Sequence, residues 1–192
     1  MQRRVRRAAV TVAAAVLLTG CASDPEASPP AGVDELTIPT PSPDPDDFVD
    51  RIDNPWLALG PGESTTLTGP TGDLVLAVGD ETTTVGGVAV TTMTLGDTSY
   101  LLAQDDDGNV WRFLEEGEAG LFMAATPRYG DGYRTAYDEG VVEERAEVTE
   151  LEGDTLEIAT IDPARPGEHT VATYENGTGL VRIETGAGVF ER

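Results

Sequence analysis

The only cysteine of this 192-residue chain, Cys21, is the residue whose surroundings specify a chemistry most closely. It directly follows Leu18-Thr19-Gly20, at the end of an uncharged run that begins at Ala8. A thiol here can accept a diacylglyceryl group, and small residues before it let the peptide enter a signal peptidase site. The pattern therefore predicts lipidation of Cys21, with cleavage between Gly20 and Cys21. A buried free cysteine, or half of an intermolecular disulfide, is the alternative.

The residues before Cys21 are typical of an export signal. Their charged part consists of Arg3, Arg4, Arg6 and Arg7. As a helix, the apolar run would span under about 20 Å, short of the roughly 30 Å of a hydrocarbon core. Residues 1–20 are therefore predicted to be a signal peptide, and the tetrapeptide ending at Cys21 resembles the bacterial lipobox. The arginines leave both the general and the twin-arginine export routes open.

Net charge restricts the partners of the chain after cleavage. The whole sequence has 12 Lys+Arg and 35 Asp+Glu; without the four signal arginines the balance is 8 against 35, a net charge of −27. Such a surface repels nucleic acid and anionic lipid headgroups. We therefore expect no nucleic-acid partner, and attachment to the extracytoplasmic face of the cell membrane only through the lipid on Cys21.

Other candidate sites in the sequence are weaker. Asp105-Asp106-Asp107-Gly108-Asn109 suggests calcium, but aligning Gly108 with the glycine of an EF-hand loop puts Ala103 and Leu114 at ligand positions. A hairpin tip with exposed acids is the simpler interpretation. The sole histidine, His169, excludes a multi-histidine metal site, and no nucleophile motif accompanies it. We predict no metal, no cofactor and no catalytic residue.

Clustered carboxylates provide the enzymatic alternative. A glycosidase needs two acids at a set spacing across a cleft. Candidates occur in two dense runs, which solvation alone explains: Glu115, Glu116 and Glu118, then Glu143, Glu144, Glu147 and Glu150.

Composition divides the mature chain into two parts. Residues 21–47 hold seven of the 13 prolines, with several acids and few large apolar residues. Such a segment cannot bury enough surface to offset its ordering entropy, so it is predicted to be a disordered stalk. A Pro-rich recognition peptide is the alternative. Residues 48–192 are predicted to form one globular domain.

Hydrophobic residues in this domain recur with period two. The clearest alternating runs are 74–78, 89–95, 100–103, 111–113, 133–137, 156–159 and 181–184. Turn signals separate them at Gly86-Gly87, Asp107-Gly108-Asn109 and Asn176-Gly177. The pattern predicts a mainly β, antiparallel domain, curved into a half-barrel, barrel or sandwich, with little helix beyond a short turn over 48–53.

Several local segments resemble a family of uncharacterised secreted proteins and lipoproteins of high-GC Gram-positive bacteria. The segments are Ile52 to Leu57 (I-D-N-P-W-L), Leu59 to Gly62, Ala103 to Trp111 (A-Q-D-D-D-G-N-V-W), Ala119 to Pro127, Gly130 to Arg134, and Gly177 to Val181. The resemblance implies a β-rich domain and no particular activity. Members of that family often carry a cysteine pair in the domain, which this chain lacks.

Aromatic residues are the best candidates for ligand contacts. In a curved sheet they either fill the core or line an apolar pocket. Five are candidates for such a lining: Trp56, Trp111, Phe113, Tyr133 and Tyr137. The favoured function is a non-catalytic domain that binds a small or lipidic ligand or an envelope component. The alternatives are a cell-surface hydrolase with paired carboxylates and a structural spacer.

Overall fold

The domain is one antiparallel β-sheet that curls almost into a closed barrel. The computed structural model describes residues 43–58, 60–114, 118–138, 141–165, 167 and 169–192. The strands are β1 (Phe48–Val49), β2 (Ser64–Gly69), β3 (Gly72–Val85), β4 (Val88–Leu95), β5 (Thr98–Asp105), β6 (Val110–Phe113), β7 (Ala119–Met123), β8 (Gly132–Asp138), β9 (Val142–Glu152), β10 (Thr155–Ile161), β11 (His169–Glu175), β12 (Gly179–Thr185) and β13 (Gly188–Glu191). This confirms the predicted mainly β, antiparallel fold.

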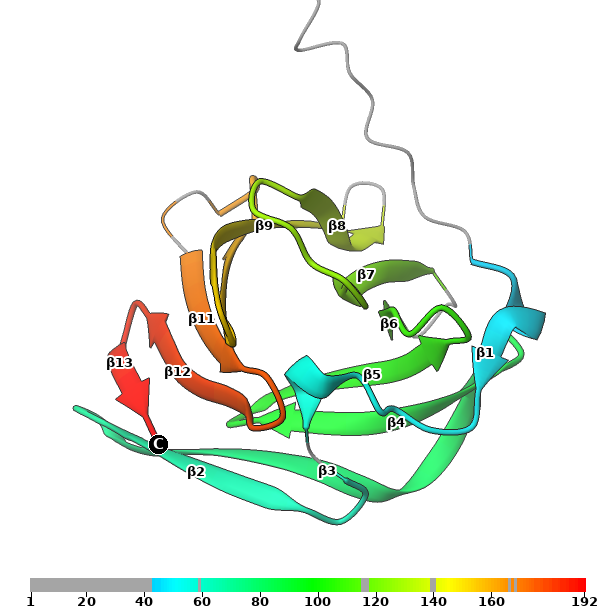
Figure 1. Cartoon of the computed structure of the whole chain (residues 1–192), viewed down its shortest axis with the longest axis horizontal. Helices are drawn as coiled ribbons and strands as arrows, with labels where there is room; N and C mark the ends of the chain where they lie inside the picture. The colour runs from blue at the N-terminus through cyan, green and yellow to red at the C-terminus, as the bar shows by residue number, and fades with distance from the viewer. Residues whose placement is uncertain (1–42, 59, 115–117, 139–140, 166, 168) are drawn as a thin grey trace, which may run out of the picture. The chain divides into compact units, whose positions relative to one another are not determined.

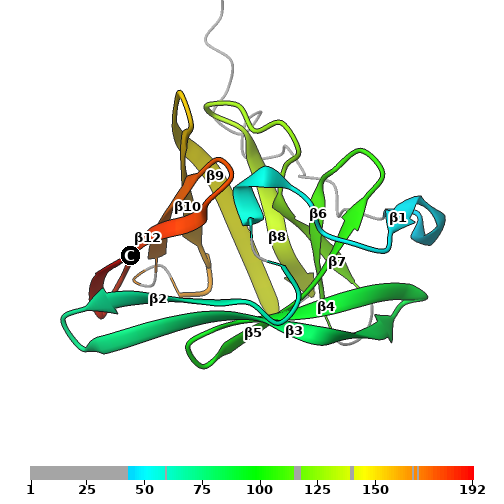
Figure 2. The same ribbon diagram turned by 60° about the horizontal axis from the view of Figure 1, so that its bottom comes forward.

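Twelve strands follow one hydrogen-bonded path, and β1 pairs separately with β5. The path runs β7-β6-β5-β4-β3-β2-β13-β12-β11-β10-β9-β8, so β7 and β8 are its two ends. These ends lie side by side (Figure 1), and Gly120 on β7 packs against the backbone of Thr135 on β8. Figure 2 shows β2 to β5 running across one side, with β8, β9 and β10 rising steeply from it. We call the β7–β8 contact the seam.

Tight turns at the three predicted positions connect consecutive strands. Gly86 and Gly87 join β3 to β4 with φ of 59° and 89°, Gly108 lies between β5 and β6 with φ of 88°, and Gly177 lies between β11 and β12 with φ of 75°. Left-handed φ values cost glycine little, whereas other residues adopt them rarely. Because of such turns, strands that follow each other in the chain also lie next to each other in the sheet, along each half of the path.

Helix is confined to two single turns of 3-10 helix among the described residues. They are Pro45–Asp47 and Pro55–Leu57, capped by the side chains of Asp44 and Asn54. The turn predicted over 48–53 is therefore wrong, because Phe48 and Val49 pair with Asp105 and Gln104 instead. The prediction of a disordered stalk over 21–47 is wrong for its last three residues, Pro45–Asp47, which form the first of these turns. Signal peptide, Cys21 and the stalk up to residue 42 lie outside the described residues.

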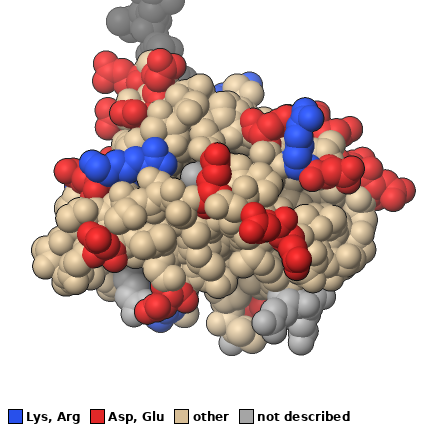
Figure 3. Space-filling view, turned by 90° about the horizontal axis from the view of Figure 1, so that it is seen from below, with Lys and Arg blue, Asp and Glu red and all other residues tan. Residues whose placement is uncertain are grey.

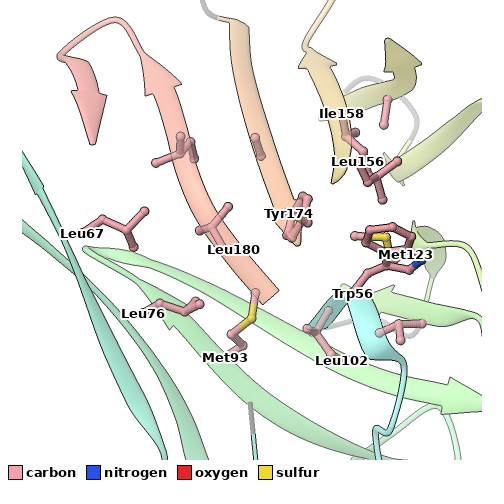
Figure 4. Packing of buried hydrophobic residues seen from close by; sticks show 14 of the residues in the cluster. Trp56, Leu67, Leu76, Met93, Leu102, Met123, Leu156, Ile158, Tyr174 and Leu180 are labelled. Atoms are coloured by element: carbon pink, nitrogen blue, oxygen red, sulfur yellow. The ribbon is translucent and has the colours of Figure 1, made fainter. Parts of the chain in front are cut away.

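The main core fills part of the barrel interior. Its members come from every side of the barrel and from the 3-10 helix Pro55–Leu57, and Figure 4 shows Trp56, Met123, Leu102 and Tyr174 converging. A smaller cluster lies on the other face of β4 to β6: Val88, Val90, Ala103, Phe113 and Ala119, with Phe48 of β1 packed against it. No helix among the described residues is long and apolar enough to cross a membrane.

Candidate functional site: a cavity inside the barrel

The barrel interior holds a cavity of about 810 Å³. Ligand pockets in proteins commonly have volumes of about 300–1,000 Å³. Much of its wall is apolar or aromatic and includes Met93, Tyr100, Leu102, Phe122, Ile158 and Tyr174. These side chains share the inward face of their strands because successive strand residues point to opposite faces. The arrangement suits an apolar molecule of moderate size.

One end of the barrel is closed by the segment that carries Asn54 and Trp56. The Asn54 amide group donates to the carbonyls of Gly108 (3.0 Å) and Ala124 (3.2 Å), and its Oδ1 accepts from the Trp56 N–H (2.9 Å). The Pro55 carbonyl accepts from the N–H of Gly177 at 2.8 Å. Asn54 therefore links two loops of the barrel end while Trp56, 6% exposed, enters the core below. We call Asp53 to Leu57 the plug.

Gln104 on β5 fixes the start of the plug. Its Oε1 accepts from the backbone N–H groups of Asp53 (2.9 Å) and Asn54 (2.8 Å), and its Nε2 donates to Asp53 Oδ1 at 2.6 Å. The hydrogen bond from Gln104, and then that from Arg51, lower the pKa of the Asp53 carboxyl. Every polar group named at this end thus has a partner, as buried polar groups normally do.

Charged side chains meet in the cavity wall beside the seam. Arg112 on β6 donates from Nη1 to Glu144 on β9, at 2.5 Å to Oε1 and 3.1 Å to Oε2. Both side chains are mostly buried, 15% and 21% exposed. The Arg112 guanidinium also lies 5.0 Å from the centre of the Tyr100 ring, and burial is the main cause that raises the pKa of that phenol.

The strand register explains how Arg112 and Glu144 meet. Arg112 pairs with Gly120 on β7, and Glu144 pairs with Ala136 on β8. A Cβ on Gly120 would lie 2.4 Å from the carbonyl carbon and oxygen of Thr135, so β7 and β8 approach closely only because residue 120 is glycine. The ion pair therefore spans the seam, linking the strands next to the two ends of the sheet.

Thr135 on β8 belongs to the same wall and directly precedes Ala136, the residue that pairs with Glu144. It is the residue skipped by the register shift between Arg134 and Ala136, so no residue of β9 is its direct partner. Bulges of this kind redirect a side chain. Thr135 lines the cavity and is 5% exposed, and its hydroxyl has no hydrogen-bond partner in the described structure. We call Arg112, Thr135 and Glu144 the polar row.

The five aromatic residues predicted to line a pocket do not belong to the lining of this cavity. Trp56 is in the plug. Trp111 and Phe113 alternate with Arg112, so they point to the outer face of β6, where Phe48 packs edge-on against Phe113 at 5.4 Å between ring centres. Tyr133 packs against the main core with its hydroxyl buried and unpartnered, and Tyr137 stacks under Arg134 at 4.4 Å. The alternation of apolar residues along each strand identified its two faces, but it did not show which face points into the barrel.

The Asp105–Asn109 run is a turn whose first acid is engaged. Asp105 is 8% exposed and accepts hydrogen bonds from the N–H and amide group of Asn109 (2.8 and 3.0 Å) and from Trp111 Nε1 (2.7 Å). Asp106 and Asp107 are exposed. In the described part of the chain, no group of three or more His, Cys, Asp or Glu residues could hold a metal ion.

The remaining acids of the sequence prediction are dispersed. Glu143 binds Arg145 and Arg134, and the hydrogen bond from Arg145 is the main cause that lowers the pKa of its carboxyl. Glu118, Glu147 and Glu150 are exposed, while Glu115 and Glu116 lie outside the described residues. Of the acids that the structure describes in these two runs, only Glu144 lines the cavity, so the interpretation of its run as wholly solvated was wrong for Glu144.

Charged groups also line the outer edge of the cavity. Asp50, Asp80 and Glu81 are exposed there, as are Arg165 and His169. Asp162 belongs to the same edge, and its hydrogen bond from the Ala164 N–H, followed by that from Arg165, lowers the pKa of its carboxyl. These carboxylates give the edge an acidic character.

Comparison with known proteins found no relative of this chain. No family model, no curated protein and no solved structure matches the chain.

Proposed function

We propose that this chain is a lipid-anchored extracytoplasmic lipoprotein that binds an apolar, lipidic ligand inside its barrel. The observation that supports the proposal most strongly is the cavity of about 810 Å³, with its largely apolar and aromatic wall, in the centre of the domain. A structural spacer gains nothing from such a cavity, because a void of this size forgoes packing contacts. Lipidation of Cys21 and the predicted signal peptide would place the domain outside the cytoplasm.

The polar groups of the cavity favour binding over hydrolysis. A pair of catalytic carboxylates would have to face each other across a cleft, one with a raised pKa. Glu144 faces Arg112 instead, and the pKa of the Asp162 carboxyl is lowered.

Mass spectrometry of molecules extracted from the purified full chain tests the binding proposal. Organic solvent should release a lipid from the wild-type chain, whereas an acyl chain on Cys21 stays covalently attached. Ala172 lines the cavity, so Ala172→Phe should fill part of it and release less; Ala89→Phe, the same change at an exposed strand position, should not. Equal amounts from all three chains, or none from any, would contradict ligand binding in the cavity.

Metabolic labelling with palmitate tests the anchor separately. The wild-type chain should incorporate the label and the Cys21→Ala chain should not. Equal labelling of both would end the proposal that Cys21 carries the lipid.

A further inference from the structure

We infer that the ligand of the cavity is an uncharged lipid, whose ester carbonyl or hydroxyl group lies against the polar row. This inference rests on the proposed function and specifies its ligand class. The polar row is the place where ionised side chains and an unpartnered buried hydroxyl come together in the largely apolar wall. It is therefore the mostly buried part of the described lining that can recognise a head group, whereas Arg51, Arg165 and His169 line the cavity as exposed residues.

Charge balance at the polar row disfavours ionised head groups. Arg112 and Glu144 neutralise each other at 2.5 Å, so neither charge is available without breaking the pair. An anionic head group placed beside Arg112 would meet Glu144, and a cationic one placed beside Glu144 would meet Arg112. Either arrangement leaves a charge without its partner in a mostly buried site, which is unfavourable.

Hydrogen-bonding capacity at the polar row suits a neutral oxygen. The Thr135 hydroxyl has no partner within the described structure, but its oxygen is buried in the wall, so it can donate to or accept from a ligand only once its side chain rotates toward the cavity. Arg112 has five N–H donors, and both of its hydrogen bonds to Glu144 run from Nη1. An ester carbonyl can accept from these donors, and a lipid hydroxyl can exchange a hydrogen bond with Thr135 once that side chain has rotated.

The charges around the cavity also disfavour an anionic ligand. Asp50, Asp80, Glu81 and Asp162 line the cavity against two exposed arginines, Arg51 and Arg165, and the chain after cleavage carries a net charge of −27. On the face shown in Figure 3, acidic side chains are spread over the surface and basic ones are few. This field opposes the approach of anionic lipids and leaves uncharged ones unaffected.

A competition series with one acyl chain and different head groups tests the inference. The full chain carrying Cys21→Ala is loaded with the fluorescent apolar probe N-phenyl-1-naphthylamine, and monopalmitoylglycerol, palmitate and hexadecane are added in turn. In the unsubstituted cavity, monopalmitoylglycerol should compete about tenfold better than palmitate, the scale expected for one desolvated charge or unmatched hydrogen bond.

Two substitutions assign the preference to the polar row. Glu144→Gln frees Arg112 and should improve competition by palmitate about tenfold. Thr135→Val removes the hydroxyl and should weaken monopalmitoylglycerol about fivefold while leaving hexadecane unchanged. Glu147→Gln, an exposed change on the same strand as Glu144, is the matched control and should alter neither. Circular dichroism verifies that each variant is folded.

The outcomes separate this inference from the proposed function. Equal competition by all three compounds would overturn head-group recognition and leave the binding cavity standing. Stronger competition by palmitate in the unsubstituted cavity would overturn the uncharged class. Failure of the probe and of every compound to bind would overturn both.

Discussion

The plug and the polar row are both polar assemblies of the barrel, yet they differ in how completely their hydrogen bonds are made. At the plug, the Asn54 side chain binds two carbonyls and one N–H, and Gln104 binds two N–H groups and a carboxylate. At the polar row, Arg112 and Glu144 bind each other, and the Thr135 hydroxyl has no partner among the described residues. A fully satisfied network stabilises one structure, whereas an unsatisfied one retains capacity for a ligand.

The largest loss of stability is expected from a substitution of Gly120, which sets the spacing between β7 and β8 beside the polar row. A Cβ there would lie 2.4 Å from the Thr135 carbonyl, and backbone cannot move aside as a side chain end can. Gly120→Ala should lower the free energy of unfolding by about 3 kcal/mol. Urea denaturation measures this. Gly186→Ala, where nothing lies within 4 Å, is the control and should change it by less than about 0.5 kcal/mol.

Asn54→Ala should have the next largest effect, because it leaves the carbonyls of Gly108 and Ala124 without their donor. We expect a loss of about 2–3 kcal/mol in the free energy of unfolding. The head-group preference of the cavity should not change. An Asn54→Ala chain of unaltered stability would mean that the plug is not what holds this end of the barrel.

The ion pair of the polar row should be costly to break and inexpensive to replace. Glu144→Gln leaves Arg112 without its partner and should cost about 2 kcal/mol, somewhat less than a fully buried pair because both groups keep some exposure. The double variant Arg112→Met, Glu144→Leu should be within about 1 kcal/mol of wild type. A double-mutant cycle by urea denaturation, with Arg112→Met and Glu144→Leu as its single variants, measures the coupling. Additive effects of the single changes would show that the pair contributes no coupling across the seam.

Thr135→Val, unlike Asn54→Ala, should not lower the stability of the domain. Since the hydroxyl is buried without a partner, its replacement by a methyl group should leave the ligand-free domain unchanged or more stable by up to about 1 kcal/mol. Thermal unfolding of lipid-free chains tests this. A clear loss of stability would show that the Thr135 hydroxyl has a structural partner.

The smallest effect is expected on the pH dependence of stability, through the ionisation of Asp53 in the plug. The pKa of Asp53 is lowered from its usual 3.8 by Gln104 and then Arg51, so its ionised form stabilises the native state at neutral pH. That contribution is lost as the pH falls below about 3.8, through the pKa of the folded state. Asp53→Asn should therefore reduce the difference between urea midpoints at pH 7 and pH 3. An unchanged difference would exclude Asp53 as a contributor.

The sequence predicted the three turns and many of the strands because both depend on local patterns, although β1, β2, β7, β9 and β13 were not among the predicted runs. Gly87, Gly108 and Gly177 mark turns that require positive φ, and the flanking runs alternate. The inward faces were not predictable in the same way. Trp111 and Phe113 form the more apolar face of β6, but β1, remote in sequence, covers that face from outside. The polar Arg112 is inside because Glu144 compensates its charge.

One signal for the polar row was present in the sequence. Glu144 shares its face of β9 with Ala146 and Val148, which are apolar and buried. An acid at the end of an apolar face indicates a charge that points inward and needs a partner. The partner could not be identified from the sequence, because Arg112 meets Glu144 only where the two ends of the sheet come together.

Direct binding of N-phenyl-1-naphthylamine to the full Cys21→Ala chain tests the central claim, that the barrel interior is a ligand site. Fluorescence titration should show saturable binding with about one probe per chain, displaced by monopalmitoylglycerol and reduced by Ala172→Phe but not by Ala89→Phe. Absence of saturable binding, or equal binding to the wall variant Ala172→Phe and the surface variant Ala89→Phe, would contradict it.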